Sequence, residues 1–151
     1  PKVSGRMDSL RAAILRPQLA ELPERVTRWN RLYGAMEAGL SDAPGLALSE
    51  RPQAEQFVGS SFQFRLPGRD GAQMLDFVAR CGARGVELKW FGAAEPAGFT
   101  SRHDSWRYVE AQDMPKTDAV LATLLDLRLP LTFSETDAAQ IARIIRDEVT
   151  R

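Results

Sequence analysis

The chain has 151 residues, of which 44% are hydrophobic and 26% charged, a composition that fits one globular domain with a buried core. Its 20 basic and 20 acidic residues balance, so the net charge favours neither a nucleic acid nor an anionic membrane as a partner. No apolar run approaches the length of a transmembrane helix. The single cysteine, Cys81, excludes an internal disulfide and indicates a reducing compartment, so we expect a cytoplasmic protein.

The first 41 residues carry an apolar stripe whose gaps alternate between four and three residues, as in an amphipathic helix. Pro23 lacks an N–H and suits the first turn of a helix, so we predict one helix over 8–20 and another over 23–41. We expect the stripe to pack in a core, with the face of Leu15, Leu22, Trp29 and Tyr33 against a further domain or a second subunit. The prolines count against a homotypic coiled coil. The stripe consists of Leu15, Leu19, Leu22, Val26, Trp29, Tyr33, Met36 and Leu40.

The middle of the chain predicts two strands separated by a helix. Residues 62–66 alternate between apolar and polar, as a half-buried strand does. Asp70 and Gln73 have the spacing of a capping box, and Gly82 and Gly85 end the helix that begins there. Residues 86–90 alternate again and predict the second strand. We expect the buried face of the helix to consist of Met74, Leu75, Val78 and Cys81.

Residues 91–115 have no clean period and are rich in aromatic side chains. A loop of this length inside a compact domain is usually functional or disordered, and the aromatic content argues against disorder. Beyond it we predict a short helix over 117–125, a strand over 127–131 and a closing helix that begins at Ser134. Pro130 cannot donate to a strand ladder, so this strand should lie at a sheet edge or end early.

Together these elements predict an α/β domain with two layers, a small and mostly antiparallel sheet of about three to four strands covered by helices, with a long helix in front.

Motifs for catalysis are sparse. A hydrolase triad depends on spatial geometry and not on adjacency, so the consecutive residues His103, Asp104 and Ser105 do not indicate one. One histidine and one cysteine do not make a metal site, and no glycine-rich phosphate loop is present. Lys89 falls on the polar side of a predicted strand, which favours a solvated lysine over a Schiff-base lysine.

Four stretches of the sequence, in the right order, resemble the C-terminal part of the DegT/StrS sugar aminotransferases, which have fold type I. SGRMDSLRAAILRPQLAEL is similar to the family's Arg-Met segment and the Leu/Ala-rich helix that follows it. ERVTRWNRLYGAMEAGLSDAPGLAL is similar to its arginine-rich helix and the strand after Pro-Gly-Leu. SSFQFRLPGRDGAQMLDFVARCGARGVELKW and MPKTDAVLATLLDLRLPLTFSETDAAQIARIIRDEV resemble its strand–helix–strand unit and its closing strand–helix unit.

The resemblance implies part of a pyridoxal-phosphate-dependent aminotransferase whose cofactor domain precedes this chain. The first residue is a proline, and we expect the chain to be the latter part of a longer protein. Residues 1–45 would then be linking and dimer-contact helices, and residues 46–151 the small C-terminal α/β domain. The Schiff-base lysine and most phosphate ligands would lie in the N-terminal domain, so the isolated chain would be inactive. The implied partners are that domain, a second subunit, an amino donor and a keto acceptor such as a sugar nucleotide.

Four positions carry over from the family's motifs as site residues. Arg6 falls on the family's arginine near the other subunit's active site, and the resemblance implies that it binds substrate. Ser4 replaces the family's asparagine, which reaches the other subunit's cofactor phosphate, and a hydroxyl has a shorter reach. Trp90 and Phe91 fall where many members have a His-Tyr pair, so they are expected to bind substrate, and the substrate stays open. No catalytic residue and no metal ligand carries over to this chain.

A noncatalytic binding or interaction module is the alternative class of protein. In that case the stripe from Leu15 to Leu40 would pair with a partner helix. The coding sequence upstream of Pro1 discriminates between the two classes.

Overall fold

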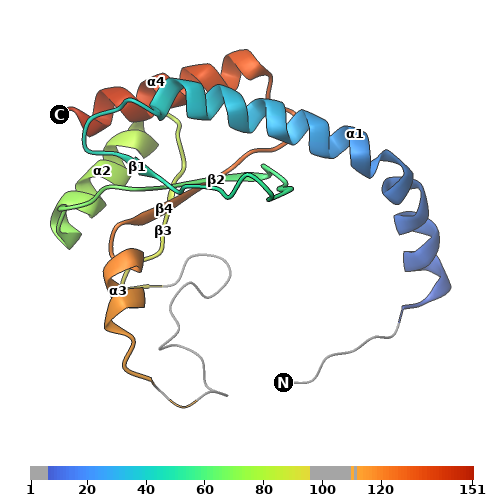
Figure 1. The fold of residues 1–151 in the computed structure, drawn as a ribbon, viewed down its shortest axis with the longest axis horizontal. Coiled ribbons are helices and arrows are strands. Elements are labelled where there is room, and N and C mark those ends of the chain that lie inside the picture. Colours follow the sequence, from blue (N-terminus) through green and yellow to red (C-terminus); the bar gives the residue numbers. More distant parts are fainter. Residues whose placement is uncertain (1–6, 96–109, 111) are drawn as a thin grey trace.

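The computed structural model describes residues 7–95, 110 and 112–151, which form helices and a four-stranded sheet (Figure 1). The strand order is β1-β2-β4-β3, and every neighbouring pair is antiparallel. The predicted fold class, a small antiparallel sheet with packed helices behind a long helix, is confirmed. None of the described helices is long and apolar enough to cross a membrane. The elements are α1 (Ser9–Leu40), β1 (Ala47–Leu48), β2 (Ser61–Arg65), α2 (Gly71–Ala83), β3 (Lys89–Trp90), α3 (Pro115–Leu121), β4 (Leu124–Arg128) and α4 (Glu135–Val149).

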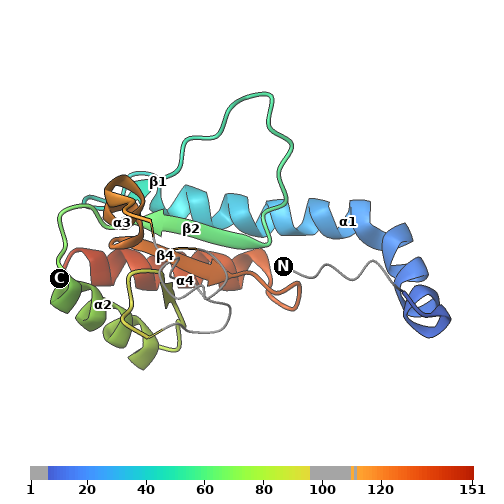
Figure 2. The ribbon, with the colours of Figure 1, turned by 90° about the horizontal axis from the view of Figure 1, so that it is seen from below.

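Helix α1 runs from Ser9 to Leu40 without a break, so the predicted division into two helices is wrong. Asp8 caps its start by accepting a hydrogen bond from the backbone N–H of Arg11 at 2.8 Å. Pro17 and Pro23 lie inside the helix, where each removes a backbone hydrogen bond and favours a bend. Figures 1 and 2 show a bend in the blue part of the ribbon. The residues around the prolines are mostly Leu, Ala, Glu and Arg, which are strong helix formers and continue the helix past them.

Only the second half of the apolar stripe on α1 packs into the core. Tyr33, Met36 and Leu40 are buried, and the Trp29 Nε1–H donates to the Leu129 carbonyl at 3.0 Å. The expected contact of Tyr33 with a further domain or subunit is therefore wrong, because its side chain is buried within this chain. Trp29 is half-buried, and its expected contact stays a prediction. The first half of α1 and the short segment before it expose the apolar side chains of Met7, Leu10, Ile14, Leu15, Leu19 and Leu22.

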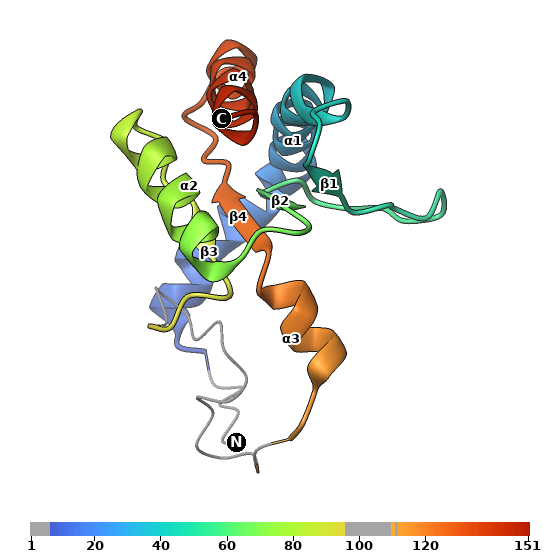
Figure 3. The ribbon, with the colours of Figure 1, turned by 90° about the vertical axis from the view of Figure 1, so that its left-hand side faces the viewer.

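Helices α1, α2 and α4 lie on the same side of the sheet (Figure 3). Helices α1 and α4 approach closely at Gly39, where an added Cβ would lie 2.7 Å from the Cβ of Ala142. Arg146 of α4 donates to the Gly39 carbonyl at 2.9 Å and to Asp42 at 2.7 Å. The core between these helices and the sheet includes Phe62, Phe64, Leu125 and Leu127.

Strand β4 lies between β2 and β3, so the predicted edge position for this segment is wrong. The strand spans Leu124–Arg128 instead of 127–131, because α3 ends at Leu121, earlier than predicted. The early end is confirmed, since the ladder finishes where the Leu129 N–H donates to the Ser60 carbonyl at 3.0 Å and Pro130 follows. Of the predicted strand 86–90, only Lys89 and Trp90 pair in the sheet, and they form β3.

Capping boxes begin α2 and α4. The Gln73 N–H donates to Asp70 at 2.9 Å, and the Asp70 N–H donates to the Gln73 side chain at 2.9 Å, as predicted. Ser134 and Asp137 make the same reciprocal pair at the start of α4. Leu75 is exposed, so its predicted place in the core is wrong. The helical period instead buries Met74, Phe77 and Cys81.

A buried carboxylate joins α2 to α4. Glu148 is fully buried and forms ion pairs with Arg80 at 3.0 Å, Arg84 at 2.8 Å and Arg151 at 3.2 Å. The hydrogen bond from Arg84, with help from Arg80, holds the pKa of Glu148 below its ordinary value of 4.5. Burial, together with the nearby Glu148 charge, raises the pKa of the Cys81 thiol to about 11. This thiol is therefore protonated and unreactive near neutral pH.

Candidate functional site

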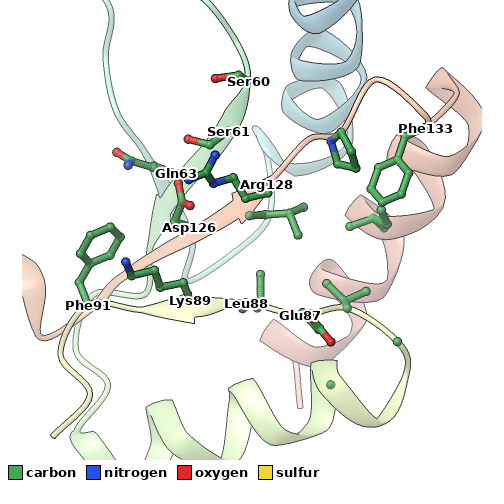
Figure 4. Close-up of a pocket in the computed structure, with 16 residues that line it drawn as sticks. Ser60, Ser61, Gln63, Glu87, Leu88, Lys89, Phe91, Asp126, Arg128 and Phe133 are labelled. Atoms are coloured by element: carbon green, nitrogen blue, oxygen red, sulfur yellow. The ribbon is translucent and has the colours of Figure 1, made fainter. Parts of the chain in front are cut away.

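A basin of about 960 Å³ lies where β2 and β4 meet the segment that leads into β3 (Figure 4). Its volume falls in the range of small-molecule pockets, roughly 300–1,000 Å³. One part of its lining is polar and another is apolar. The basin is lined by Ser60, Ser61, Gln63, Gly82, Gly85, Val86, Glu87, Leu88, Lys89, Phe91, Asp126, Leu127, Arg128, Pro130, Phe133 and Ile141.

The polar part of the basin lies on the sheet face opposite the core side chains, which we call the open sheet face. Side chains alternate along a strand, and Gln63 on β2 and Lys89 on β3 both stand opposite Asp126 on β4. Ser61 stands opposite Arg128, two residues further along β4. Directly opposed residues have Cβ atoms about 5 Å apart, so the register brings these five side chains together. Figure 4 shows them above β2, β3 and β4.

Asp126 is the buried member of this group, with 9% of its surface exposed. Its Oδ1 atom is buried and accepts no hydrogen bond in the described part of the chain. The side chains of Ser61, Gln63 and Arg128 make no hydrogen bond or ion pair with the described residues either. A buried carboxylate oxygen without a donor is uncommon in native proteins. Asp126 therefore marks a position where a donor from another group would fit.

The apolar part of the basin lies between the segment before β3 and the start of α4. Val86, Phe133 and Ile141 form this wall. At the other end of the basin, the Lys89 Nζ lies 5.1 Å from the centre of the Phe91 ring, a cation–π distance. The basin can therefore accept a group that is apolar at one end and hydrogen-bonding at the other.

The structure separates the two adjacent residues that the sequence assigns to substrate binding. Phe91 lines the basin, whereas Trp90 is not among its lining residues. The Trp90 Nε1–H donates to the Ala122 carbonyl at 2.9 Å, and the ring packs closely against Gly92. Ser4 and Arg6 lie outside the described residues. The roles assigned to all four stay predictions.

Sequence reasoning missed Gln63, Asp126 and Arg128 as site candidates. Because the predicted strand begins at residue 127, Asp126 falls outside it. The available signal was the alternation of Asp126 and Arg128 with the leucines on either side of them. That pattern places them on the polar face of a strand, but the pairing with Gln63 depends on sheet register, which local sequence does not determine.

The geometry offers no metal centre, because no group of three or more His, Cys, Asp or Glu side chains converges among the residues that the structure describes.

The model of the DegT/DnrJ/EryC1/StrS aminotransferase family matches residues 2–146. The chain therefore belongs to this family, and the resemblance read from the sequence is confirmed. Among curated proteins, none matches the chain significantly.

Solved structures with the same fold include aminotransferases. The aminotransferase TlmJ from Streptoalloteichus hindustanus is 21% identical with a TM-score of 0.76, over 93% of this chain and 36% of TlmJ. 3-Amino-5-hydroxybenzoic acid synthase is 24% identical with a TM-score of 0.76, over 99% of this chain and 41% of the synthase. Spr1654 from Streptococcus pneumoniae, assigned as a sugar aminotransferase and solved in PMP form, is 14% identical with a TM-score of 0.76, over 96% of this chain and 36% of its own.

These likenesses establish the fold, and they also show a difference in length. The chain spans only 36–41% of the length of these three neighbours. The greater part of each neighbour therefore has no counterpart in this sequence.

The described residues do not fit a pyridoxal phosphate site. Helix N-termini commonly hold phosphate groups, but the N-termini of α2 and α4 are closed by the side chains of Asp70 and Asp137. The end of α2 that reaches the basin is its C-terminal end at Gly82, whose carbonyl dipoles disfavour an anion. Of the described lysines, Lys116 is exposed on α3, and Lys89 lies over an aromatic ring. If the protein uses this cofactor, the groups that hold it lie elsewhere.

Proposed function

We propose that this chain is the C-terminal part of a pyridoxal-phosphate-dependent aminotransferase that acts on a sugar nucleotide or a related keto substrate. The observation that carries the proposal is the family match over residues 2–146. The cofactor is supported by Spr1654, which is solved in both PLP and PMP forms. The sugar substrate is supported by neighbours such as DesI, solved with its TDP-sugar product, which is 19% identical with a TM-score of 0.66.

In this proposal a cofactor-binding domain precedes the chain. Residues 1–45 link the two domains and contact a second subunit, and residues 46–151 form the small C-terminal domain. The exposed apolar side chains on the first half of α1 support such a contact, because large exposed apolar patches usually mark interfaces. The full-length protein would be a cytoplasmic homodimer, and the unpaired Cys81 supports a reducing compartment.

Four side chains of this chain would serve the active site of the dimer. Ser4 and Arg6 would reach the cofactor phosphate and the substrate of the other subunit. Trp90 and Phe91 would border the substrate entrance, and the position of Phe91 in the basin supports its part in this role. The chain alone would be inactive, since the protein must supply a linking lysine and electronic partners for the cofactor.

A noncatalytic interaction module is the second candidate, because the same exposed side chains of α1 would also serve it. Leu15, Leu19 and Leu22 are exposed on α1 and could pack against a partner helix. The surface available for such pairing is shorter than the stripe from Leu15 to Leu40, because Tyr33, Met36 and Leu40 are already in the core.

The coding sequence upstream of Pro1 tests the proposal. We expect an additional domain of about 200 residues or more, with a strand followed by a lysine in its cofactor segment. A start codon immediately before Pro1 would contradict the proposal and favour the interaction module.

A further inference from the structure

We propose that the open sheet face is the docking surface for the N-terminal part of the full-length protein, and that Asp126 accepts a hydrogen bond from an N–H group of that part. This inference rests on the proposed function only in assuming that an N-terminal part exists. It does not depend on the reaction that the full-length protein catalyses.

The buried Oδ1 atom of Asp126 lacks a hydrogen-bond donor within the described ranges of the chain. Removing a charged group from water without a hydrogen bond is costly. The other buried carboxylate among the described residues, Glu148, has three arginine partners, whereas the buried Oδ1 of Asp126 has no donor there. A donor on a docked surface would remove this cost.

Polar side chains around Asp126 are also available to a second surface. Arg128 lies two residues away on the same face of β4, yet the two side chains do not form an ion pair. Both remain able to pair with another surface, and so does the Gln63 amide beside them (Figure 4). The complementary surface therefore carries an N–H donor opposite Asp126 and a carboxylate or carbonyl opposite Arg128.

The open sheet face is broad enough to contact another domain. The unpaired side chains belong to two adjacent strands, and the basin extends from them to an apolar wall at one end, formed by Val86, Phe133 and Ile141. Protein interfaces combine polar and apolar groups in this way. The other side of the sheet is already covered by α1, α2 and α4 (Figure 3). More than half of each structural neighbour lies outside the matched region, which is enough chain to form the cover.

Thiol labelling of Arg128→Cys tests the docking surface directly. Arg128 is exposed in this structure, and the single native thiol, Cys81, is buried and reacts slowly. We expect a thiol reagent to label position 128 at least about tenfold more slowly in the full-length protein than in the 151-residue chain, since docking removes access. Ala79→Cys is the matched control, because Ala79 is exposed on α2, away from the open sheet face, and should label equally in both proteins.

Equal labelling of position 128 in the two proteins would overturn the proposal, and so would equal protection of positions 79 and 128. Protection in the 151-residue chain that grows with its concentration would assign the face to a second copy and also overturn it. Transamination is measured separately on the same full-length protein. Protection at position 128 without transamination would contradict the proposed function and support the docking surface.

Asp126→Asn tests the hydrogen bond. In the 151-residue chain this change removes an unpaired buried charge, so the urea midpoint should stay or rise. In the full-length protein it replaces a charged acceptor by a neutral amide and so weakens a charge-assisted hydrogen bond, and the midpoint should fall. A fall of equal size in both proteins, or no change in the full-length protein, would contradict the assigned role of Asp126.

Discussion

Two buried carboxylates of this chain have opposite surroundings. Glu148 lies between α2 and α4 with Arg80 and Arg84, whereas Asp126 lies on the open sheet face without a donor for its Oδ1 atom. A buried carboxylate with its own arginine partners stabilises the domain that contains it. A buried carboxylate without partners can instead accept a hydrogen bond from a second surface that docks on the domain.

The pH dependence of stability should report on Glu148. Its pKa is lowered in the folded state by Arg84 and then by Arg80. Its contribution to the free energy of unfolding is therefore present above the unfolded-state value near 4.5 and is lost as the pH falls through the lower folded value. We expect Glu148→Gln to lower the urea midpoint at neutral pH, because it removes the ion pairs of the buried carboxylate with Arg80 and Arg84. The variant should also lose less stability than the parent on acidification.

Glu21→Gln is the control for this experiment, because Glu21 is exposed on α1 and the change in charge is the same. It should follow the parent at every pH. Identical pH profiles for the parent and Glu148→Gln would show that the arginine pairs contribute nothing to folding.

At the scale of elements, the close approach of α1 and α4 predicts opposite effects for two glycines of the same helix. Gly39→Ala places a Cβ 2.7 Å from the Ala142 Cβ. We expect it to lower the free energy of unfolding by about 1–3 kcal/mol. Gly34→Ala meets nothing within 4 Å and should raise the free energy by up to about 1 kcal/mol through helix propensity. Chemical denaturation measures both, and a stabilising Gly39→Ala would contradict the helix packing.

Local signals predicted the elements well where one residue pattern determines the structure. Asp70 with Gln73 marked the start of α2, and the alternation around Phe62 and Phe64 marked β2. Prediction failed at Pro23, which suggests a helix start. The strong helix formers around this proline instead continue α1 past it.

The candidate site was harder to predict than the elements. Gln63, Lys89 and Asp126 come from three strands that are far apart in the sequence, and only sheet register brings them together. Phe91 was identified through the family resemblance, because a single aromatic residue after a strand carries no signal of its own. The same resemblance suggested Trp90, whose indole N–H is already bonded to the Ala122 carbonyl.

At the scale of the whole molecule, the exposed apolar side chains of α1 predict association. Leu10 is 71% exposed and Leu19 is 66% exposed. We expect the 151-residue chain to form a dimer or a higher oligomer in solution, because apolar patches of this kind drive association. Light scattering of the parent and of the double variant Leu10→Glu with Leu19→Glu measures the effect.

The double variant should be monomeric with an unchanged melting temperature, because both side chains lie outside the core. Leu75→Glu, at an exposed leucine of α2, should associate like the parent. A parent that stays monomeric at high concentration would contradict this prediction.

The central claim is that this chain is the C-terminal part of an aminotransferase whose cofactor is held outside it. The most direct test is to reduce the full-length protein and the 151-residue chain with borohydride in the presence of pyridoxal phosphate, and to map the adduct by mass spectrometry. The account predicts one adduct per full-length chain, on a lysine N-terminal to Pro1, and none on the 151-residue chain. A stoichiometric adduct on Lys2, Lys89 or Lys116, or no adduct on the full-length protein, would contradict the claim.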